Sequence, residues 1–183
     1  MKFNVELSLL LILNLCVLKT VKCHDTPIIG VLTQELLLEH KDENDRLSNQ
    51  SFIAASYVRF VQISGARVMP VEIKKDPQYY ENVIKYTNGL LLPGGWAPLG
   101  DSEYTRAAYL MLDAAMKANQ EGDYYPVWGV CLGCEVMADY FANKTVIVTK
   151  CGSMDATMPL KFVVTNYRNT MFEHASRDLM RVS

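Results

Sequence analysis

A chain of 183 residues in which half are hydrophobic and 21% are charged has the composition of a globular domain, not of a disordered segment. Its formal net charge is only −2, and it carries no arginine-rich stripe or basic run, which argues against nucleic acid as the main partner. The length suits one α/β domain with a core of its own.

The first 23 residues have the features of a secretory signal peptide. Lys2 gives a positive start, and an apolar run follows from Leu7 to Leu18. This run is too short for a transmembrane helix. We therefore expect this leader to be cut before His24, residues 24–183 to form the domain, and the protein to be secreted or lysosomal.

The sequons and the cysteine count agree with passage through the secretory pathway. N-glycosylation sequons begin at Asn49 and Asn143. Of the five cysteines, Cys131, Cys134 and Cys151 remain after the leader. An odd number in an oxidising compartment leaves at least one thiol free or intermolecular, as in a thiol enzyme, and excludes a disulfide-dense scaffold.

Strands and helices are predicted to alternate from the start of the domain. Pro27–Thr33 is an apolar run typical of a buried parallel strand, and residues 34–50 are predicted to form a polar loop. Ser51 is expected to cap a helix that continues to about Ser64. Gly65 ends this helix, and Ala66–Val71 is predicted as the second strand. The apolar face expected for the helix comprises Ile53, Tyr57, Phe60 and Ser64.

The same alternation continues to the cysteine-rich region. Asp76 and Pro77 open a helix in the favoured cap-then-proline order. Its predicted apolar stripe comprises Tyr80, Val83, Ile84 and Thr87. The later predicted elements are a strand at Leu90–Leu92, a helix from near Ser102 to Asn119, the strand that delivers Cys131, and further strands at Thr145–Thr149 and Pro159–Val164.

This alternation predicts an α/β fold, with a parallel sheet flanked by helices on both faces. In such sheets ligands bind at the carboxyl ends of the strands. Gly94-Gly95 and Cys131 both follow predicted strands, so we expect them to share one site. The bare N–H groups of the Pro-Gly-Gly loop would then supply an oxyanion donor.

Cys131 lies between Gly129 and Gly133, after a short apolar run and before a helix-like segment. This spacing suits a sharp strand-to-helix turn in which the backbone passes closely and the nucleophile is exposed. The N–H groups from Leu132 onward and the helix dipole favour a thiolate, and they can also hold an oxyanion. The hypothesis is a nucleophile elbow built around Cys131.

Two other interpretations of these cysteines stay open. Cys131 and Cys134 form a C-x-x-C at a strand-to-helix junction, where the redox pair of a secreted dithiol oxidoreductase would lie. Both cysteines can also be small buried hydrophobes of the core.

From about Pro27 to about Phe172 the sequence resembles the gamma-glutamyl hydrolase family of the class I glutamine amidotransferase-like superfamily. The most specific motif runs from Gly122 to Gly133, with the sequence GDYYPVWGVCLG. The other matching motifs are Pro27–Val31 (PIIGV), Ala54–Val58 (AASYV), Gly65–Val68 (GARV) and Leu92–Gly95 (LPGG).

The resemblance implies a cysteine hydrolase that cleaves γ-linked glutamate from folyl and antifolyl polyglutamates. The nucleophile would be Cys131, through an acyl-thioester, with backbone oxyanion contacts at Leu132, Gly94 and Gly95. Glu135 would face the substrate, unless it only stabilises the helix N-terminus. No metal or organic cofactor is implied. The implied partner is a small-molecule substrate, and a homodimer is left open.

The sequence departs from the family in its catalytic base. The family completes its triad with a Trp-His-Pro-Glu-like segment that this sequence lacks. Its three histidines, His24, His40 and His174, stand in no such context. His174 is the remaining candidate for a substitute base, although a surface histidine is the ordinary expectation. We therefore expect a fragment or truncated form, with its C-terminal part missing and with poor or no hydrolysis. A non-catalytic folate-binding or interaction domain is the alternative.

Overall fold

The computed structural model describes residues 26–36, 50–143, 149, 168 and 173–175. The chain divides into two units, Met1–Ile147 and Val148–Ser183. The described helices and strands all belong to the first unit. The leader and both ends of the predicted domain lie outside the described residues. The last two predicted strands also lie outside them, apart from Thr149.

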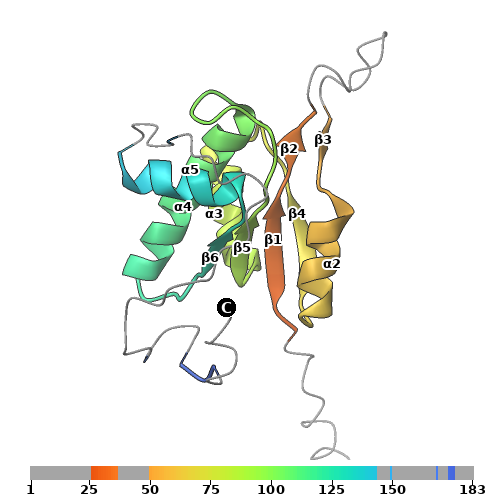
Figure 1. The fold of residues 1–183 in the computed structure, drawn as a ribbon. Coiled ribbons are helices and arrows are strands. Elements are labelled where there is room, and N and C mark those ends of the chain that lie inside the picture. The colour runs from red at the N-terminus through yellow and green to blue at the C-terminus, as the bar shows by residue number, and fades with distance from the viewer. Residues whose placement is uncertain (1–25, 37–49, 144–148, 150–167, 169–172, 176–183) are drawn as a thin grey trace, which may run out of the picture. The chain divides into compact units, whose positions relative to one another are not determined.

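Four parallel strands form the sheet in the order β4-β1-β5-β6 (Figure 1). Gly30 of β1 pairs with Met69 of β4 on one side and with Leu90 of β5 on the other. Leu91 of β5 pairs in turn with Trp128 of β6. In chain order, β4 is added on one side of β1, and β5 and β6 are then added on its other side. The four strands are β1 (Ile28–Leu32), β4 (Arg67–Val71), β5 (Gly89–Leu92) and β6 (Val127–Gly129).

Helices cover both faces of this sheet, which confirms the predicted α/β class. Helix α2 (Ala55–Ile63) lies on one face (Figure 1). The other face carries α3 (Pro77–Tyr86), α4 (Glu103–Gln120) and α5 (Leu132–Phe141). None of the described helices combines the length and the apolar character that a membrane crossing requires.

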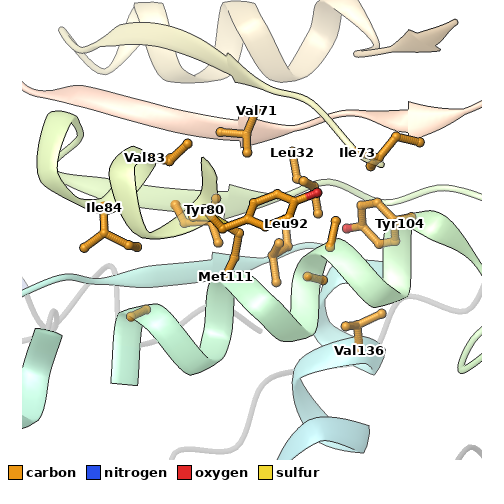
Figure 2. Packing of buried hydrophobic residues seen from close by; sticks show 14 of the residues in the cluster. Leu32, Val71, Ile73, Tyr80, Val83, Ile84, Leu92, Tyr104, Met111 and Val136 are labelled. Atoms are coloured by element: carbon orange, nitrogen blue, oxygen red, sulfur yellow. The ribbon is translucent and has the colours of Figure 1, made fainter. Parts of the chain in front are cut away.

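The larger hydrophobic core lies between the sheet and helices α3, α4 and α5. Figure 2 shows Tyr80 of α3 and Met111 of α4 packed against residues of the strands. All four members of the stripe predicted for α3 are buried, which confirms the helical period there. A smaller cluster beneath α2 is formed by Val31, Val61 and Leu91.

The start of α2 differs from the prediction. The helix begins at Ala55, and its N-cap residue Ala54 offers no side-chain hydrogen bond. Ser51 instead belongs to β3 (Ser51–Phe52), which pairs antiparallel with β2 (Gln34–Glu35). The predicted cap at Ser51 is therefore wrong. The predicted loop at residues 34–50 is also wrong at Gln34 and Glu35, which form β2. A two-residue strand is too short to show the alternation by which strands are found in a sequence.

The later start also changes which side of α2 is buried. Val61 is 5% exposed, whereas Phe60 is 55% exposed and Ser64 lies on the surface. Tyr57 does pack against the smaller cluster, as does Ile53, which precedes the helix. The predicted apolar face was thus wrong at Phe60 and Ser64. The N-cap is Ala54, three residues after the predicted Ser51, and the position that faces the sheet after Tyr57 is Val61, about one helical turn on.

The predicted helix starts at Asp76 and Ser102 are confirmed. The Asp76 side chain accepts from the Tyr79 N–H at 2.8 Å, and the Ser102 hydroxyl accepts from the Thr105 N–H at 3.1 Å.

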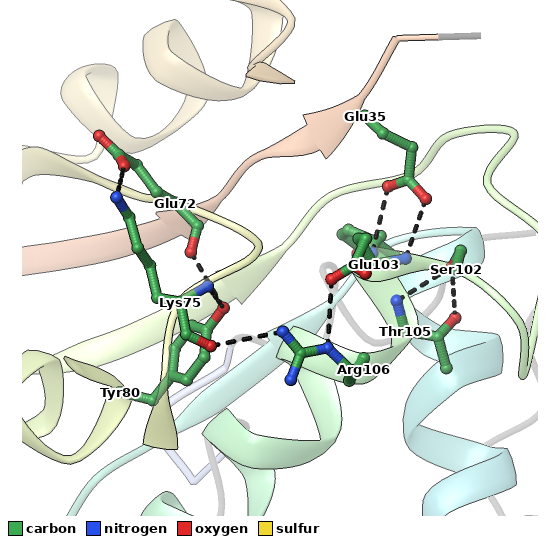
Figure 3. A network of polar contacts seen from close by, with 9 residues as sticks. Glu35, Glu72, Lys75, Tyr80, Ser102, Glu103, Thr105 and Arg106 are labelled. Carbon is green, nitrogen blue, oxygen red and sulfur yellow. Dashed lines mark hydrogen bonds and ion pairs between the residues drawn. The ribbon is translucent and has the colours of Figure 1, made fainter. Parts of the chain in front are cut away.

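Helix α4 has a second cap from outside the helix. The two carboxylate oxygens of Glu35 accept from the N–H groups of Glu103 and Tyr104, both at 3.1 Å (Figure 3). A carboxylate at this end also suits the helix dipole. The short strand β2 is thereby tied to the start of α4.

Candidate active site

Cys131 occupies the turn between β6 and α5. It is the N-cap residue of α5, with φ 51° and ψ −116°, and its side chain is exposed. A residue with a Cβ rarely adopts a positive φ, and such backbone strain gathers at functional sites. The predicted sharp strand-to-helix turn is therefore present. Cys134 is also exposed, so the interpretation of the two cysteines as core residues was wrong.

The glycines on either side of Cys131 permit close backbone approaches. An ideal Cβ on Gly133 would lie 2.1 Å from the carbonyl oxygen of Leu92 in β5. One on Gly129 would lie 2.7 Å from the backbone of Gly133 itself. Neither position has room for a side chain, because the opposing atoms are backbone. The Gly-x-Cys-x-Gly spacing thus packs the elbow directly against the end of the neighbouring strand.

Most backbone N–H groups of the elbow are already bonded. The N–H of Gly133 donates to the Val130 carbonyl at 2.9 Å, and those of Cys134 and Glu135 donate to the Cys131 carbonyl at 2.9 and 3.0 Å. Within the described part of the chain, the Leu132 N–H has no such acceptor. Of the N–H groups predicted near the sulfur, this one remains available for an oxyanion.

The loop after β5 lies against the elbow. An ideal Cβ on Gly94 would come within 2.9 Å of the Cys131 Cβ. The Gly94 N–H donates to the Tyr57 hydroxyl at 2.8 Å, and the Pro93 carbonyl accepts from the Tyr104 hydroxyl at 2.6 Å. The peptide between Pro93 and Gly94 is therefore engaged at both ends. The Gly94 N–H predicted as an oxyanion donor is occupied, whereas the Gly95 N–H has no acceptor among the residues that the structure describes.

Residues of two helices, α2 and α5, line the site together with this loop. An open pocket of about 520 Å³ is lined by Tyr57, Gly94, Gly95, Trp96, Ala97, Leu99, Cys131, Leu132 and Glu135. Burial raises the pKa of Tyr104, behind the loop, well above its usual range, with smaller contributions from Tyr57 and Cys131. Tyr104 is therefore a neutral hydrogen-bond donor. Glu135 lines the pocket, whereas Cys134 is not among the described lining residues.

Two residues of this site were not predicted to serve it. Tyr57 was expected only as an apolar helix residue, and Gln34 only as part of a loop. Gln34 is 5% exposed and donates from Nε2 to the Gly94 carbonyl at 2.7 Å. Its one signal in the sequence is its place directly after the first predicted strand, Pro27–Thr33, where ligands gather in parallel sheets.

The described residues of the first unit include no histidine. His24 and His40 lie outside the described residues, and His174 belongs to the second unit. A substitute base at His174 therefore stays a prediction. The same described residues hold no cluster of three or more His, Cys, Asp or Glu suited to a metal ion.

Of the two sequon asparagines, Asn143 is among the described residues and Asn49 is not. Asn143 is exposed, next to the C-cap residue of α5, with φ 58°. Asn49 lies outside the described residues.

Comparison with known proteins shows the family of this chain. Residues 27–144 match the model of the family Peptidase C26. The gamma-glutamyl hydrolase of Bos taurus is 37% identical over 154 residues, which is 84% of this chain and 47% of that protein. The Homo sapiens gamma-glutamyl hydrolase is 35% identical over 156 residues, and gamma-glutamyl hydrolase B of Dictyostelium discoideum is 32% identical over 165 residues. They cover 84% and 87% of this chain and 47% and 45% of those relatives.

The chain thus spans about half the length of the curated relatives it matches. The matched region contains the four strands, the elbow and the loop after β5. The chain belongs to the Peptidase C26 family, with the gamma-glutamyl hydrolases among its relatives.

Proposed function

We propose that this chain is a cysteine hydrolase of γ-glutamyl bonds, with Cys131 as its nucleophile and folyl poly-γ-glutamates as its substrates. The observation that carries the proposal is the backbone of Cys131, held at a positive φ in a pocket that Leu132 and Gly95 line, whose N–H groups have no acceptor in the described part of the chain. The substrate class comes from the relatives, which are named gamma-glutamyl hydrolases.

The proposed chemistry has two steps. The Cys131 sulfur attacks the γ-carbonyl carbon, and the carbonyl oxygen becomes an oxyanion held by the N–H groups of Leu132 and Gly95. The C–N bond then breaks, the leaving amine takes up a proton, and a thioester remains. Water adds to the thioester through a second oxyanion. The products are the shortened γ-carboxylate and the free thiol.

The chemistry needs a group that takes the Cys131 thiol proton as a base and then, once protonated, gives a proton to the leaving amine. The described residues of the first unit include no histidine for this role. Among the residues that line the pocket, the titratable ones are Tyr57, Cys131 and Glu135. A placed base typically contributes about 10²- to 10⁴-fold to such a step. We therefore expect the chain by itself to hydrolyse slowly and to respond to an added base.

The experiment is to incubate the purified chain with folyl triglutamate and measure released glutamate, with and without imidazole as an external base. We expect slow release that imidazole increases. The Cys131→Ser variant should abolish it, and Cys134→Ser should leave it unchanged. Release that survives Cys131→Ser, or binding of the folate with no release in either buffer, would contradict the proposal. Loss of activity with Cys134→Ser would instead indicate dithiol chemistry.

We also propose that the chain enters the secretory pathway, on the basis of its leader and its sequons. Asn143 is exposed and thus accessible to modification. Expression in insect cells should yield a secreted or vesicular product, shortened at the N-terminus, whose mass falls after N-glycosidase treatment. A cytosolic product that still begins at Met1 would contradict this proposal.

A further inference from the structure

Gln34 contacts the Gly94-Gly95 loop of this site, although its position in the sequence gives little indication of such a contact. Its side chain is almost fully buried, and its amide donates to the Gly94 carbonyl at 2.7 Å. It also packs on the next residue, because an ideal Cβ on Gly95 would lie only 1.7 Å from Gln34 Oε1. The Gly-Gly loop is thus shaped around this one amide group.

The strand order places the Gly-Gly loop between Gln34 and Cys131. Gln34 follows β1 and Cys131 follows β6, while the loop follows β5, which lies between those two strands. The same separation appears in the hollows at this edge of the sheet. Gly95, Trp96 and Ala97 line both the pocket that contains Cys131 and a second hollow of about 480 Å³ that Gln34 lines. The loop is a wall with Gln34 behind it and Cys131 in front.

This placement fixes the direction of one N–H group. No peptide bond in the described part of the chain is cis, and in a trans peptide the C=O and the following N–H point in opposite directions. The carbonyl of Gly94 points toward Gln34. The Gly95 N–H of the same peptide therefore points away from Gln34, toward the side of the wall on which Cys131 lies.

We propose that Gln34 is the positioning residue of the oxyanion site. Its hydrogen bond holds the Gly94–Gly95 peptide so that the Gly95 N–H faces the Cys131 sulfur, opposite the Leu132 N–H. A peptide between two glycines has little steric resistance to turning over, so the orientation needs a tether from outside the loop. The inference rests on the proposed function, because it concerns the oxyanion that the Cys131 thiolate would create.

Two substitutions separate the tether from the space that Gln34 fills. In Gln34→Glu the carboxylate accepts hydrogen bonds but donates none, so it repels the Gly94 carbonyl and favours the reversed peptide. In Gln34→Met the volume is kept and the donor is lost, so the peptide is free to sample both orientations. Gln62→Glu, at an exposed position of α2, introduces the same charge elsewhere and is the matched control.

The measurement compares two electrophiles at Cys131. Iodoacetamide alkylates the sulfur by displacing iodide and creates no oxyanion. The γ-aldehyde of N-(4-aminobenzoyl)glutamate adds the sulfur to its carbonyl carbon, and the carbonyl oxygen becomes an oxyanion that can take a proton from water. This addition is reversible, so its dissociation constant follows from how strongly the aldehyde protects Cys131 against alkylation, as measured by mass spectrometry.

We expect Gln34→Glu to weaken aldehyde binding by about 10²-fold, the lower end of what removing one oxyanion donor typically causes. Gln34→Met should weaken it less, by about tenfold or below, because the competent orientation stays populated. Alkylation without aldehyde should keep its rate in both variants and in Gln62→Glu. Equal aldehyde binding in all four proteins would overturn the role of Gln34 and leave the proposed function standing. A natural chain that is alkylated but not protected by the aldehyde would overturn the oxyanion site itself, and the inference with it.

The natural chain also allows a test that does not depend on the variants folding. With ¹⁵N-glycine labelling, its ten glycines give a small set of amide signals. We expect the Gly95 amide proton to shift strongly downfield when the aldehyde is bound, while the Gly94 amide, bonded to Tyr57, changes little. A shift at Gly94 in place of Gly95 would overturn the assignment of the donor and the role of Gln34.

Discussion

Two segments meet at the candidate site, and they are held in place in opposite ways. The elbow around Cys131 is fixed by backbone packing, through a strained residue and two glycines, Gly129 against the elbow itself and Gly133 against Leu92 of β5. The loop from Pro93 to Gly95 is fixed by side chains of Gln34, Tyr57 and Tyr104. Two of these are 60 and 37 residues away in the chain. An elbow of this kind can be recognised locally, whereas the support of such a loop cannot.

The largest effect is expected where the elbow touches β5. Gly133→Ala should destabilise the fold by about 3 kcal/mol or more, because the new methyl group meets the Leu92 backbone, which has no rotamer with which to move away. Urea unfolding measures this. Gly122→Ala is the control, since Gly122 has open space and only its φ of 90° to strain. Its loss should be about 1–2 kcal/mol. Equal losses at the two glycines would show that the elbow is not packed as described.

Removing one hydrogen bond that supports the loop should destabilise the fold less than the Gly133 substitution does. Tyr104→Phe removes the donor to the Pro93 carbonyl, and we expect a loss of about 1–2 kcal/mol in the free energy of unfolding. Tyr125→Phe removes a hydrogen bond of similar geometry, to Thr87 at 2.7 Å, away from the site. Both should lower stability, but only Tyr104→Phe should weaken binding of the γ-aldehyde. The same aldehyde affinity in both variants would show that the loop does not need its tyrosine.

The strain at Cys131 predicts a smaller effect, in which glycine makes the fold more stable than alanine does. A positive φ strains a residue that has a Cβ by about 1–3 kcal/mol, and glycine relieves this strain. The greater freedom of glycine in the unfolded chain offsets roughly 0.4–1 kcal/mol of the stability so gained. Cys131→Gly should therefore be more stable than Cys131→Ala by about 1 kcal/mol. Paired urea titrations test this. An alanine variant as stable as the glycine variant would mean that the turn is not strained.

The buried tyrosines predict an effect that appears only in alkali. Burial raises the pKa of Tyr125 to about 12, from the usual tyrosine value of 10.0. The folded chain therefore keeps a proton that the unfolded chain loses above about pH 10, so stability is full below that pH and falls as the pH rises toward 12. Tyr125→Phe should make the decline in stability between pH 10 and 12 shallower, while the slope of stability against pH near neutrality stays the same. An unchanged slope would show that Tyr125 is not protected in the fold.

The contrast between the two segments also explains what could be predicted from the sequence. The strands at Leu90–Leu92 and before Cys131, the caps at Asp76 and Ser102, and the elbow itself depend on residues adjacent in the chain, and each was predicted. The start of α2 was missed, because Ser51 pairs with Glu35 in a two-residue ribbon. Long-range pairing of so short a segment leaves no periodic signal.

The site follows the same division. The loop and Cys131 were expected to share one edge of the sheet because parallel strands end together, and the structure places them in one pocket. Which glycine N–H is available was beyond prediction. That depends on the hydrogen bond that the Tyr57 hydroxyl accepts and the one that the Gln34 amide donates, and these partners are set by the fold and not by neighbours in sequence.

The central claim is that Cys131 accepts an acyl group. Its most direct test uses the 4-nitrophenyl γ-ester of N-(4-aminobenzoyl)glutamate, whose leaving group departs without being protonated and so needs no histidine. The account predicts release of about one nitrophenol per chain in a first, fast phase, and peptide mapping by mass spectrometry should place the acyl group on Cys131. An acyl group on Cys134 or Cys151, or a fast phase that persists in Cys131→Ser, would contradict it.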